Sequence, residues 1–286
     1  LNQQPMLLAF TLLLFGATVG SFLNVVIFRI PAMIEREERA YCRELLEGEE
    51  PEPQEPFNLV TPNSRCPHCG HAIRAWENIP VISYLLLRGR CSDCQAGISM
   101  RYPVIEMVSA ALAVFLGYHY GGADITLLAA LVFTWALLAL TMIDFDTMLL
   151  PDSITLPLLW LGLLANLFGL FTSLEEAVIG AMAGYGVLWS VYWLFKLATG
   201  KEGMGYGDFK LLAALGAWLG WKALPMIILL SSLVGALLGI LIMYLQQRGR
   251  DIPMPFGPFL AVAGWIALVW GNDLMAWYWS ALGPQG

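Results

Sequence analysis

Charged residues are scarce in this sequence. Asp, Glu, Lys and Arg make up 13% of its 286 residues, whereas a soluble domain of this length carries roughly a quarter charged residues. Hydrophobic residues make up 58%, and the mean hydropathy is +0.66. This balance excludes an ordinary soluble enzyme and predicts an all-α integral membrane protein in a lipid bilayer.

Three further features of the composition exclude other classes of protein. With only five cysteines, the chain is no disulfide-stapled miniprotein, and an aromatic content of 12% excludes a disordered or collagen-like chain. Basic residues are not in excess, since the formal net charge is −7, so we expect no nucleic acid partner.

Eight apolar stretches approach the roughly 20 residues that a helix needs to cross a ~30 Å hydrocarbon core. They lie at 6–28, 103–120, 125–143, 154–172, 177–198, 209–221, 223–245 and 258–279. The first lacks the basic segment and cleavage site of a secretory signal, so we expect a retained helix. We predict about eight transmembrane helices. Because 209–221 is short, seven spans, or six with a re-entrant segment, are the alternatives.

The basic residues indicate an orientation. With an even number of spans, all 15 except Lys222 fall on one side of the membrane, which the positive-inside rule assigns to the cytoplasm. These residues are Arg29, Arg36, Arg39, Arg43, Arg65, Arg74, Arg88, Arg90, Arg101, Lys196, Lys201, Lys210, Arg248 and Arg250. Both termini are then outside.

The largest segment between apolar stretches, 31–101, contains a metal-ligand pattern. Two CxxC pairs, Cys66 with Cys69 and Cys91 with Cys94, are separated by 21 residues. This spacing is typical of two knuckles that present four thiolates to one zinc ion. A cytoplasmic loop disfavours disulfides, so we predict a small zinc-binding domain whose closed Zn²⁺ site is structural. A redox dithiol pair and unliganded cysteines are the alternatives.

The same segment begins with an acidic stretch. Between residues 35 and 55, nine glutamates outnumber three arginines. We interpret the stretch as a solvated helix followed by a linker, and attraction of a basic peptide is the alternative.

Two aspartates at predicted helix ends are candidate catalytic residues. A carboxylate at the bilayer centre costs about 2.5 to 3.5 kcal/mol, so its presence needs a reason. Asp144 directly follows the third stretch and Asp208 directly precedes the sixth, and the orientation places both at the cytoplasmic boundary. Two carboxylates that meet share a proton, and the pair can activate a water and donate a proton. This predicts hydrolysis of a peptide bond by an aspartyl pair.

The glycines and carboxylates near the two aspartates are expected to have other roles. Gly205 and Gly207 lack a Cβ, so the backbone can come close to Asp208 and to an extended substrate. Asp152 is expected to cap the following helix, and Asp146 should point about 200° away from Asp144. Glu106 is expected either to pair with an arginine in the helix bundle or to be part of a functional site. Motifs of the GxSxG and HExxH kinds are absent, which leaves the aspartyl pair as the hydrolytic chemistry.

Several motifs together resemble the bacterial type IV prepilin peptidases over nearly the whole chain. They are Gly20-Ser21-Phe22-Leu23-Asn24-Val25-Val26-Ile27 followed by Arg29 and Pro31, the double CxxC, Arg101-Tyr102-Pro103 with Glu106, Ile143-Asp144 leading to Leu150-Pro151-Asp152, and Gly203-Met204-Gly205-Tyr206-Gly207-Asp208-Phe209-Lys210. The resemblance implies a multi-pass enzyme of the bacterial inner membrane whose active site faces the cytoplasm. Such an enzyme cleaves the basic leader from type IV prepilins and type II secretion pseudopilins. It then N-methylates the new terminal residue with S-adenosylmethionine.

The resemblance also implies residue roles. Asp144 and Asp208 match the catalytic aspartates, and the metal ligands match Cys66, Cys69, Cys91 and Cys94. We accordingly divide the chain into a first transmembrane helix at 1–30, a cytoplasmic zinc domain at 31–101 and a polytopic peptidase core at 102–286.

The sequence contains no clear motif for the methyl-donor site. No Gly-rich nucleotide loop follows a strand, so the donor must bind outside a Rossmann frame. As a hypothesis, we place it near Asn24, Arg29, Glu77 and Glu106.

Two functions from other classes compete with this one. The first is an ion-coupled membrane transporter that relays ions through Asp144 and Asp208, and the second is a non-catalytic assembly scaffold with a zinc-bound docking domain. The carboxylates lie on one side of the membrane rather than at mid-depth, which counts against transport.

Overall fold

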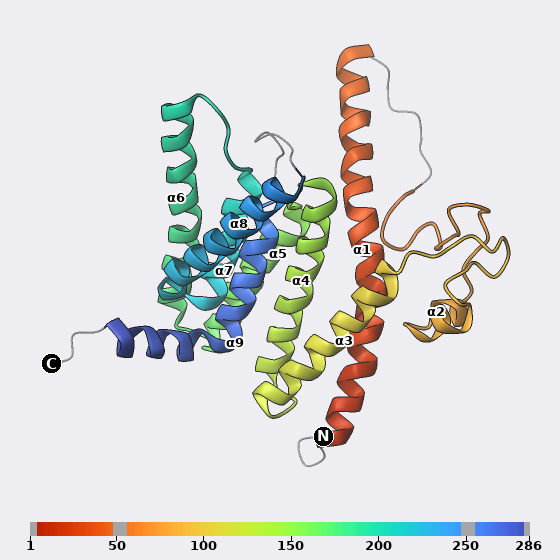
Figure 1. Cartoon of the computed structure of the whole chain (residues 1–286), viewed down its shortest axis with the longest axis horizontal. Coiled ribbons are helices and arrows are strands. Elements are labelled where there is room, and N and C mark those ends of the chain that lie inside the picture. The colour runs from red at the N-terminus through yellow and green to blue at the C-terminus, as the bar shows by residue number, and fades with distance from the viewer. Residues whose placement is uncertain (1–4, 48–55, 247–254, 283–286) are drawn as a thin grey trace. The chain divides into compact units, whose positions relative to one another are not determined.

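The computed structural model describes residues 5–47, 56–246 and 255–282, and this part of the chain is helical with no β-sheet (Figure 1). The all-α prediction is therefore confirmed. The chain divides into two compact units, residues 1–131 and 132–286, and their boundary falls inside helix α4 (Ile125–Thr147). Each unit is described by itself below.

The first unit is built on two long helices, α1 (Pro5–Glu47) and α3 (Arg101–Tyr120), with the short η1 (Ala75–Asn78) and α2 (Ile82–Leu86) between them in sequence. Glycines let α1 and α3 pack closely. A Cβ on Gly16 would lie 2.8 Å from the Ala110 Cα, and one on Gly20 would lie 2.7 Å from the Glu106 Cα. Small residues at a helix crossing are typical of membrane bundles, where close backbone packing drives association.

Helix α1 is longer than the apolar stretch predicted. The helix continues through Pro31 to Glu47. Pro31 lacks the N–H that would bond the Ile27 carbonyl, but the segment after it is rich in Glu, Arg, Ala and Leu, which favour helix. The charged helix predicted from residue 35 is thus an extension of the first membrane helix. The rest of the acidic stretch, at 48–55, lies outside the described residues, as do Arg248 and Arg250.

The second unit contains the end of α4 and five further α-helices. They are α5 (Asp152–Leu167), α6 (Leu174–Thr199), α7 (Tyr206–Leu219), α8 (Leu224–Gln246, after the short η2 at Trp221–Ala223) and α9 (Gly257–Leu282). Helix α7 contacts α5, α6 and α9, and every residue from Leu211 to Trp218 is buried. It is apolar all round, as expected for a core helix.

Helix lengths and surfaces identify an integral membrane protein. Each of the eight predicted apolar stretches overlaps a helix, although α5 ends at Leu167, before the predicted end at residue 172. Among the described residues, six helices, α1, α3, α4, α6, α8 and α9, are long and apolar enough to cross a bilayer. Helices α5 and α7 have only 16 and 14 residues. One face of α8 exposes a row of large apolar side chains at helical spacing, which suits lipid and not water. The row consists of Leu229, Leu233, Leu237 and Ile240, which are 54 to 66% exposed.

Candidate active site and metal centre

The second unit brings the two candidate aspartates together. Asp144 lies in the last turn of α4 and Asp208 in the first turn of α7, and the two residues are only 4% and 7% exposed. The charge of Asp144 acts directly on Asp208, so the carboxylates are neighbours although they are far apart in sequence. Asp146, in contrast, is exposed, as its predicted direction requires.

Close backbone contacts surround Asp144. Its Oδ2 is buried without a hydrogen-bond partner among the described residues. Gly257, the first residue of α9, lies against this atom, since a Cβ there would be 2.6 Å from Oδ2 and 3.1 Å from the Leu150 methyls. Leu150 also fills the space beside Gly207, whose Cβ would lie 2.7 Å from the Leu150 Cβ. The missing Cβ of Gly207 therefore makes room for Leu150, whereas a Cβ on Gly205 would be an ordinary 4.0 Å from the Asp208 Oδ2.

An ion pair connects α5 to α7 close to Asp208. Asp152 is the first residue of α5, as predicted, but Pro151 takes the N-cap position and no side chain caps the helix there. Instead, both carboxylate oxygens of Asp152 accept hydrogen bonds from the Lys210 Nζ at 2.7 Å. This pair ties the start of α5 to the first turns of α7.

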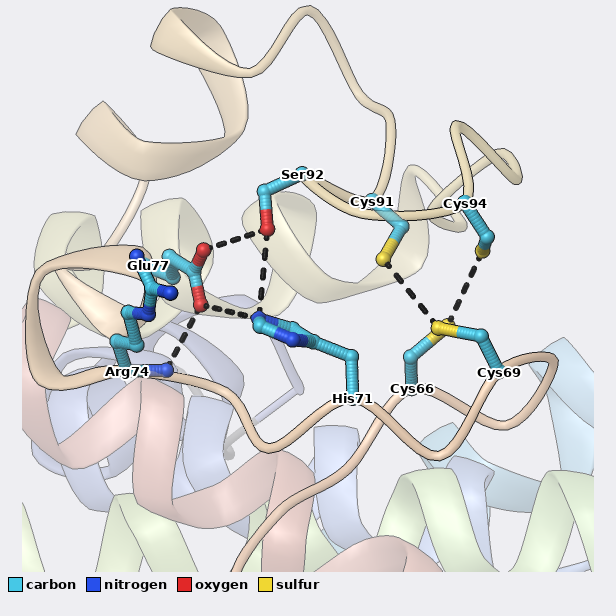
Figure 2. A network of polar contacts seen from close by, with 8 residues as sticks. All are labelled: Cys66, Cys69, His71, Arg74, Glu77, Cys91, Ser92 and Cys94. Atoms are coloured by element: carbon cyan, nitrogen blue, oxygen red, sulfur yellow. Dashed lines mark hydrogen bonds and ion pairs between the residues drawn. The ribbon is translucent and has the colours of Figure 1, made fainter.

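The four predicted cysteine ligands form one cluster in the first unit (Figure 2). The Sγ atoms of Cys66 and Cys94 are 3.8 Å apart, those of Cys69 and Cys91 are 4.0 Å apart, and all four lie within 4.8 Å of one another. A tetrahedral site with Zn–S bonds of about 2.3 Å needs sulfur atoms about 3.8 Å apart. None of these thiols is in a disulfide, so the cluster can hold a metal ion.

Two matching knuckles position these thiols. In the first, the Cys66 N–H donates to the His71 carbonyl at 2.9 Å, and the Gly70 N–H donates to the Cys66 carbonyl. In the second, the Cys91 N–H and the Gln95 N–H make the corresponding bonds to Ala96 and Cys91. Gly70 has a φ of +73°, a left-handed conformation that glycine adopts without strain, and Gln95 takes the same position at +59°.

A buried carboxylate joins the two knuckles (Figure 2). The Glu77 side chain, only 4% exposed, accepts hydrogen bonds from the Ser92 hydroxyl at 2.6 Å and from the Arg74 N–H at 2.8 Å, and it lies 3.3 Å from the His71 Nε2. His71 belongs to the first knuckle and Ser92 to the second. The hydrogen bond from Ser92, followed by that from Arg74, lowers the pKa of Glu77 to about 2.

The other three residues of the predicted methyl-donor site also have partners in the first unit. The Asn24 amide donates to the carbonyls of Gly20 and Tyr102, both at 3.2 Å. Arg29 donates to the carbonyls of Asn58 and Pro62 at 2.7 and 2.6 Å. These contacts connect α1 to the start of α3 and to the segment before the first knuckle.

Glu106 holds a strained turn. Its carboxylate accepts a hydrogen bond from the Val81 N–H at 2.7 Å. Val81 has a φ of +61°, and the Ile82 N–H donates to the Pro80 carbonyl across it at 2.6 Å, which is a γ-turn that a β-branched residue rarely adopts. Glu106 thus fixes the loop that leads from η1 to α2.

Gly257 and Leu150 lie next to the aspartate site, and neither was predicted as part of it. Nothing in their residue types indicates chemistry, because one supplies a close backbone approach and the other an apolar contact. The only available signal is that Gly257 precedes Pro258 at the start of an apolar stretch, a combination typical of a helix start.

Comparisons with known proteins agree with this layout. Residues 14–120 match the model of the bacterial peptidase A24 N-terminal domain, and residues 131–240 match that of the type IV leader peptidase family. The chain is 56% identical to a prepilin leader peptidase/N-methyltransferase of Stutzerimonas stutzeri and 57% identical to one of Pseudomonas aeruginosa, in both cases over 97% of this chain and 96% of the relative. A protein of the same name from Aeromonas hydrophila is 60% identical over 93% of this chain and 91% of the relative.

No solved structure matches the chain significantly. The family models cover both halves of the chain in order, and the relatives extend over almost all of it. The chain therefore belongs to the type IV leader peptidase family.

Proposed function

We propose that this chain is an aspartic endopeptidase that cleaves the basic leader from type IV prepilins and type II secretion pseudopilins, and an N-methyltransferase that modifies the new terminal residue. The names of its relatives support both activities. The observation that carries the peptidase assignment is the buried pair of Asp144 and Asp208 at the ends of two helices.

This arrangement suits general acid–base hydrolysis. Two neighbouring carboxylates with little solvent share one proton. The ionised member takes a proton from a water, whose oxygen attacks the scissile carbonyl, and the protonated member donates to the carbonyl oxygen. Collapse of the tetrahedral intermediate then breaks the C–N bond, and a proton returned to the nitrogen releases the free amine. Asp144 and Asp208 are the residues to which we assign these roles.

The location of the pair fits a substrate that is itself a membrane helix. Asp144 lies in the last turn of α4, and helix ends occur where the chain leaves the hydrocarbon core. A prepilin carries its basic leader outside the bilayer, so its scissile bond would meet the aspartates at the membrane surface. The distribution of basic residues supports the inner membrane, with this surface facing the cytoplasm.

We assign zinc to the cysteine cluster. The four thiols have the chemistry and spacing that zinc prefers, and with four protein ligands no coordination position is left for a substrate. When bound, zinc would supply folding energy by joining the two knuckles, and Glu77 would orient them from outside the ligand set.

The methyltransferase half uses S-adenosylmethionine as methyl donor in this proposal. The amine that the peptidase step releases is the group to be methylated. Asn24, Arg29, Glu77 and Glu106 remain our candidates for the donor site, and each already holds another part of the first unit. Replacing one of them should change donor affinity measured by titration, and unchanged affinity in all four variants would remove this site.

Incubation with a synthetic prepilin N-terminal peptide, read by mass spectrometry, tests both activities. Asp144→Asn and Asp208→Asn should each abolish leader removal while methylation of a pre-cleaved peptide continues. Asp146→Asn is the matched control, because it removes an exposed carboxylate two residues away and should cleave normally. Full cleavage by either buried variant would leave the transporter or the scaffold as the better explanation.

A further inference from the structure

The start of helix α9 is built around Gly257 and Pro258. The Phe256 carbonyl accepts the first helical hydrogen bonds, from the N–H groups of Phe259 at 3.1 Å and Leu260 at 3.2 Å. Gly257 and Pro258 therefore form the first turn, and both are buried. Proline has no N–H, so Gly257 carries the backbone N–H at this helix end that no helical hydrogen bond uses.

Gly257 is needed for space rather than for conformation. Its φ lies outside the left-handed region, so its backbone is open to any L-residue. Glycine also weakens a helix relative to alanine. An alanine methyl here, however, would lie 2.6 Å from the Asp144 Oδ2, well inside van der Waals contact. The Asp144 side chain is buried, and the Leu150 methyls lie 3.1 Å from the same point, so both neighbours crowd a side chain at position 257.

The electrostatics of this contact also favour a carboxylate beside Gly257. The beginning of a helix carries a partial positive charge and favours a carboxylate. The Asp144 Oδ2, buried and without a hydrogen-bond partner among the described residues, faces this end. Helix α9 thus joins α4, which carries Asp144, and α7, which carries Asp208, at this site.

We propose that Gly257 is a positioning residue of the aspartate site, and that the start of α9 holds the Asp144 carboxylate in the orientation in which it meets Asp208. This proposal rests on the proposed peptidase function. Gly257 acts through Asp144 and contributes no atom to bond breaking. The bare backbone lets the carboxylate lie directly against the helix end, and any side chain at this position displaces it.

The test is Gly257→Ala, assayed with the prepilin peptide at several concentrations. A carboxylate displaced by about 1 Å should lower kcat for cleavage by about 100-fold, with KM changed less than about threefold. Methylation of a pre-cleaved peptide should continue, which shows that the variant is folded. Gly271→Ala is the matched control on the same helix, because its Cβ would meet only the Met226 Cε at 3.9 Å, and it should cleave normally. A Gly257→Ala variant with normal kcat overturns the proposal.

A second variant separates the two contacts of a residue-257 methyl. Leu150→Ala removes the apolar neighbour, so recovery of cleavage in Gly257→Ala/Leu150→Ala would show crowding against Leu150 and would overturn the role of Asp144. Continued loss in the double variant supports it. If Gly257→Ala fails to accumulate, the same change is made together with Asp144→Ala, which removes the clashing carboxylate. Restored thermal stability then supports the contact, and no gain overturns it.

The outcomes also separate this inference from the function on which it rests. If Asp144→Asn cleaves normally, the peptidase assignment fails. If Asp144→Asn is inactive but Gly257→Ala is normal, only the role of Gly257 fails.

Discussion

The crossing of α6 and α7 should control peptidase activity from a distance. The two helices touch through backbone atoms: a Cβ on Gly180 would lie 2.3 Å from the Gly216 carbonyl oxygen, and one on Gly216 would lie 2.2 Å from the Gly180 oxygen. A turn further along α6, a Cβ on Gly184 would lie 2.5 Å from the Leu212 oxygen. No side chain at this crossing can rotate to relieve a new methyl group.

The effect of Gly180→Ala follows from these distances. Carbon and carbonyl oxygen approach to about 3.3 Å at closest, so the new methyl must push the helices apart by about 1 Å. Helix α7 carries Asp208 in its first turn, so the displacement shifts one carboxylate of the pair. A misplacement of about 1 Å can cost about 100-fold in rate, and some of it will be absorbed by tilting of the helix. We therefore expect kcat for cleavage to fall by roughly 10- to 100-fold, with a free energy of unfolding lowered by about 1 to 3 kcal/mol.

Gly186→Ala is the matched control for this experiment. Gly186 lies on the same helix, and nothing lies within 4 Å of its Cβ position. Purified variants should be compared in detergent for cleavage of the prepilin peptide, methylation of a pre-cleaved peptide and thermal unfolding. Normal kcat in Gly180→Ala, or an equal loss in Gly186→Ala, would refute the reasoning.

Three further predictions use the polar contacts of the two units. Asn166→Ala removes the hydrogen bonds that the amide donates to the carbonyls at the end of α7 and those that its oxygen accepts from the Phe171 and Thr172 N–H groups, just after α5. It should lower the free energy of unfolding by about 2 to 4 kcal/mol, and an unchanged melting temperature would contradict this. Glu77→Gln should increase the rate at which zinc is released to a chelator, measured by metal analysis, while prepilin cleavage changes little. Equal release rates in the variant and the wild type would mean that the carboxylate does not orient the knuckles. Lys210→Met should reduce cleavage only a few-fold, because the ion pair of Lys210 with Asp152 is partly exposed and worth about 1 kcal/mol or less. If this pair matters as a link between α5 and α7, a double variant with Asp at position 210 and Lys at position 152 should restore activity.

Hydropathy alone predicted most of the architecture. Each of the eight apolar stretches contains a helix, and the positions of Asp144 and Asp208 at helix ends followed from where the apolar residues stop. The cysteine knuckles could also be predicted from the sequence, because CxxC spacing is a local property that determines how the thiols are presented.

Features that depend on neighbours from another part of the chain were not predictable. Pro31 normally indicates a helix end, yet α1 continues past it, because strong helix formers follow and only one backbone hydrogen bond is lost. Asp152 was expected to cap a helix, yet its carboxylate binds Lys210, which local sequence cannot reveal. The contact of Gly257 with Asp144 depends on a missing atom, and a missing atom has no pattern in sequence.

The end of α7 opposite Asp208 shows how the second unit supports a polar site. The last carbonyls of this 14-residue helix have no partners within the helix, and unbonded backbone carbonyls are costly in a membrane protein. Asn166 meets that demand, because its amide donates to the carbonyls of Ala217 and Trp218 at 2.8 and 2.9 Å. With these carbonyls bonded, α7 can be buried from Leu211 to Trp218, and its first turn is left to present Asp208 beside Asp144.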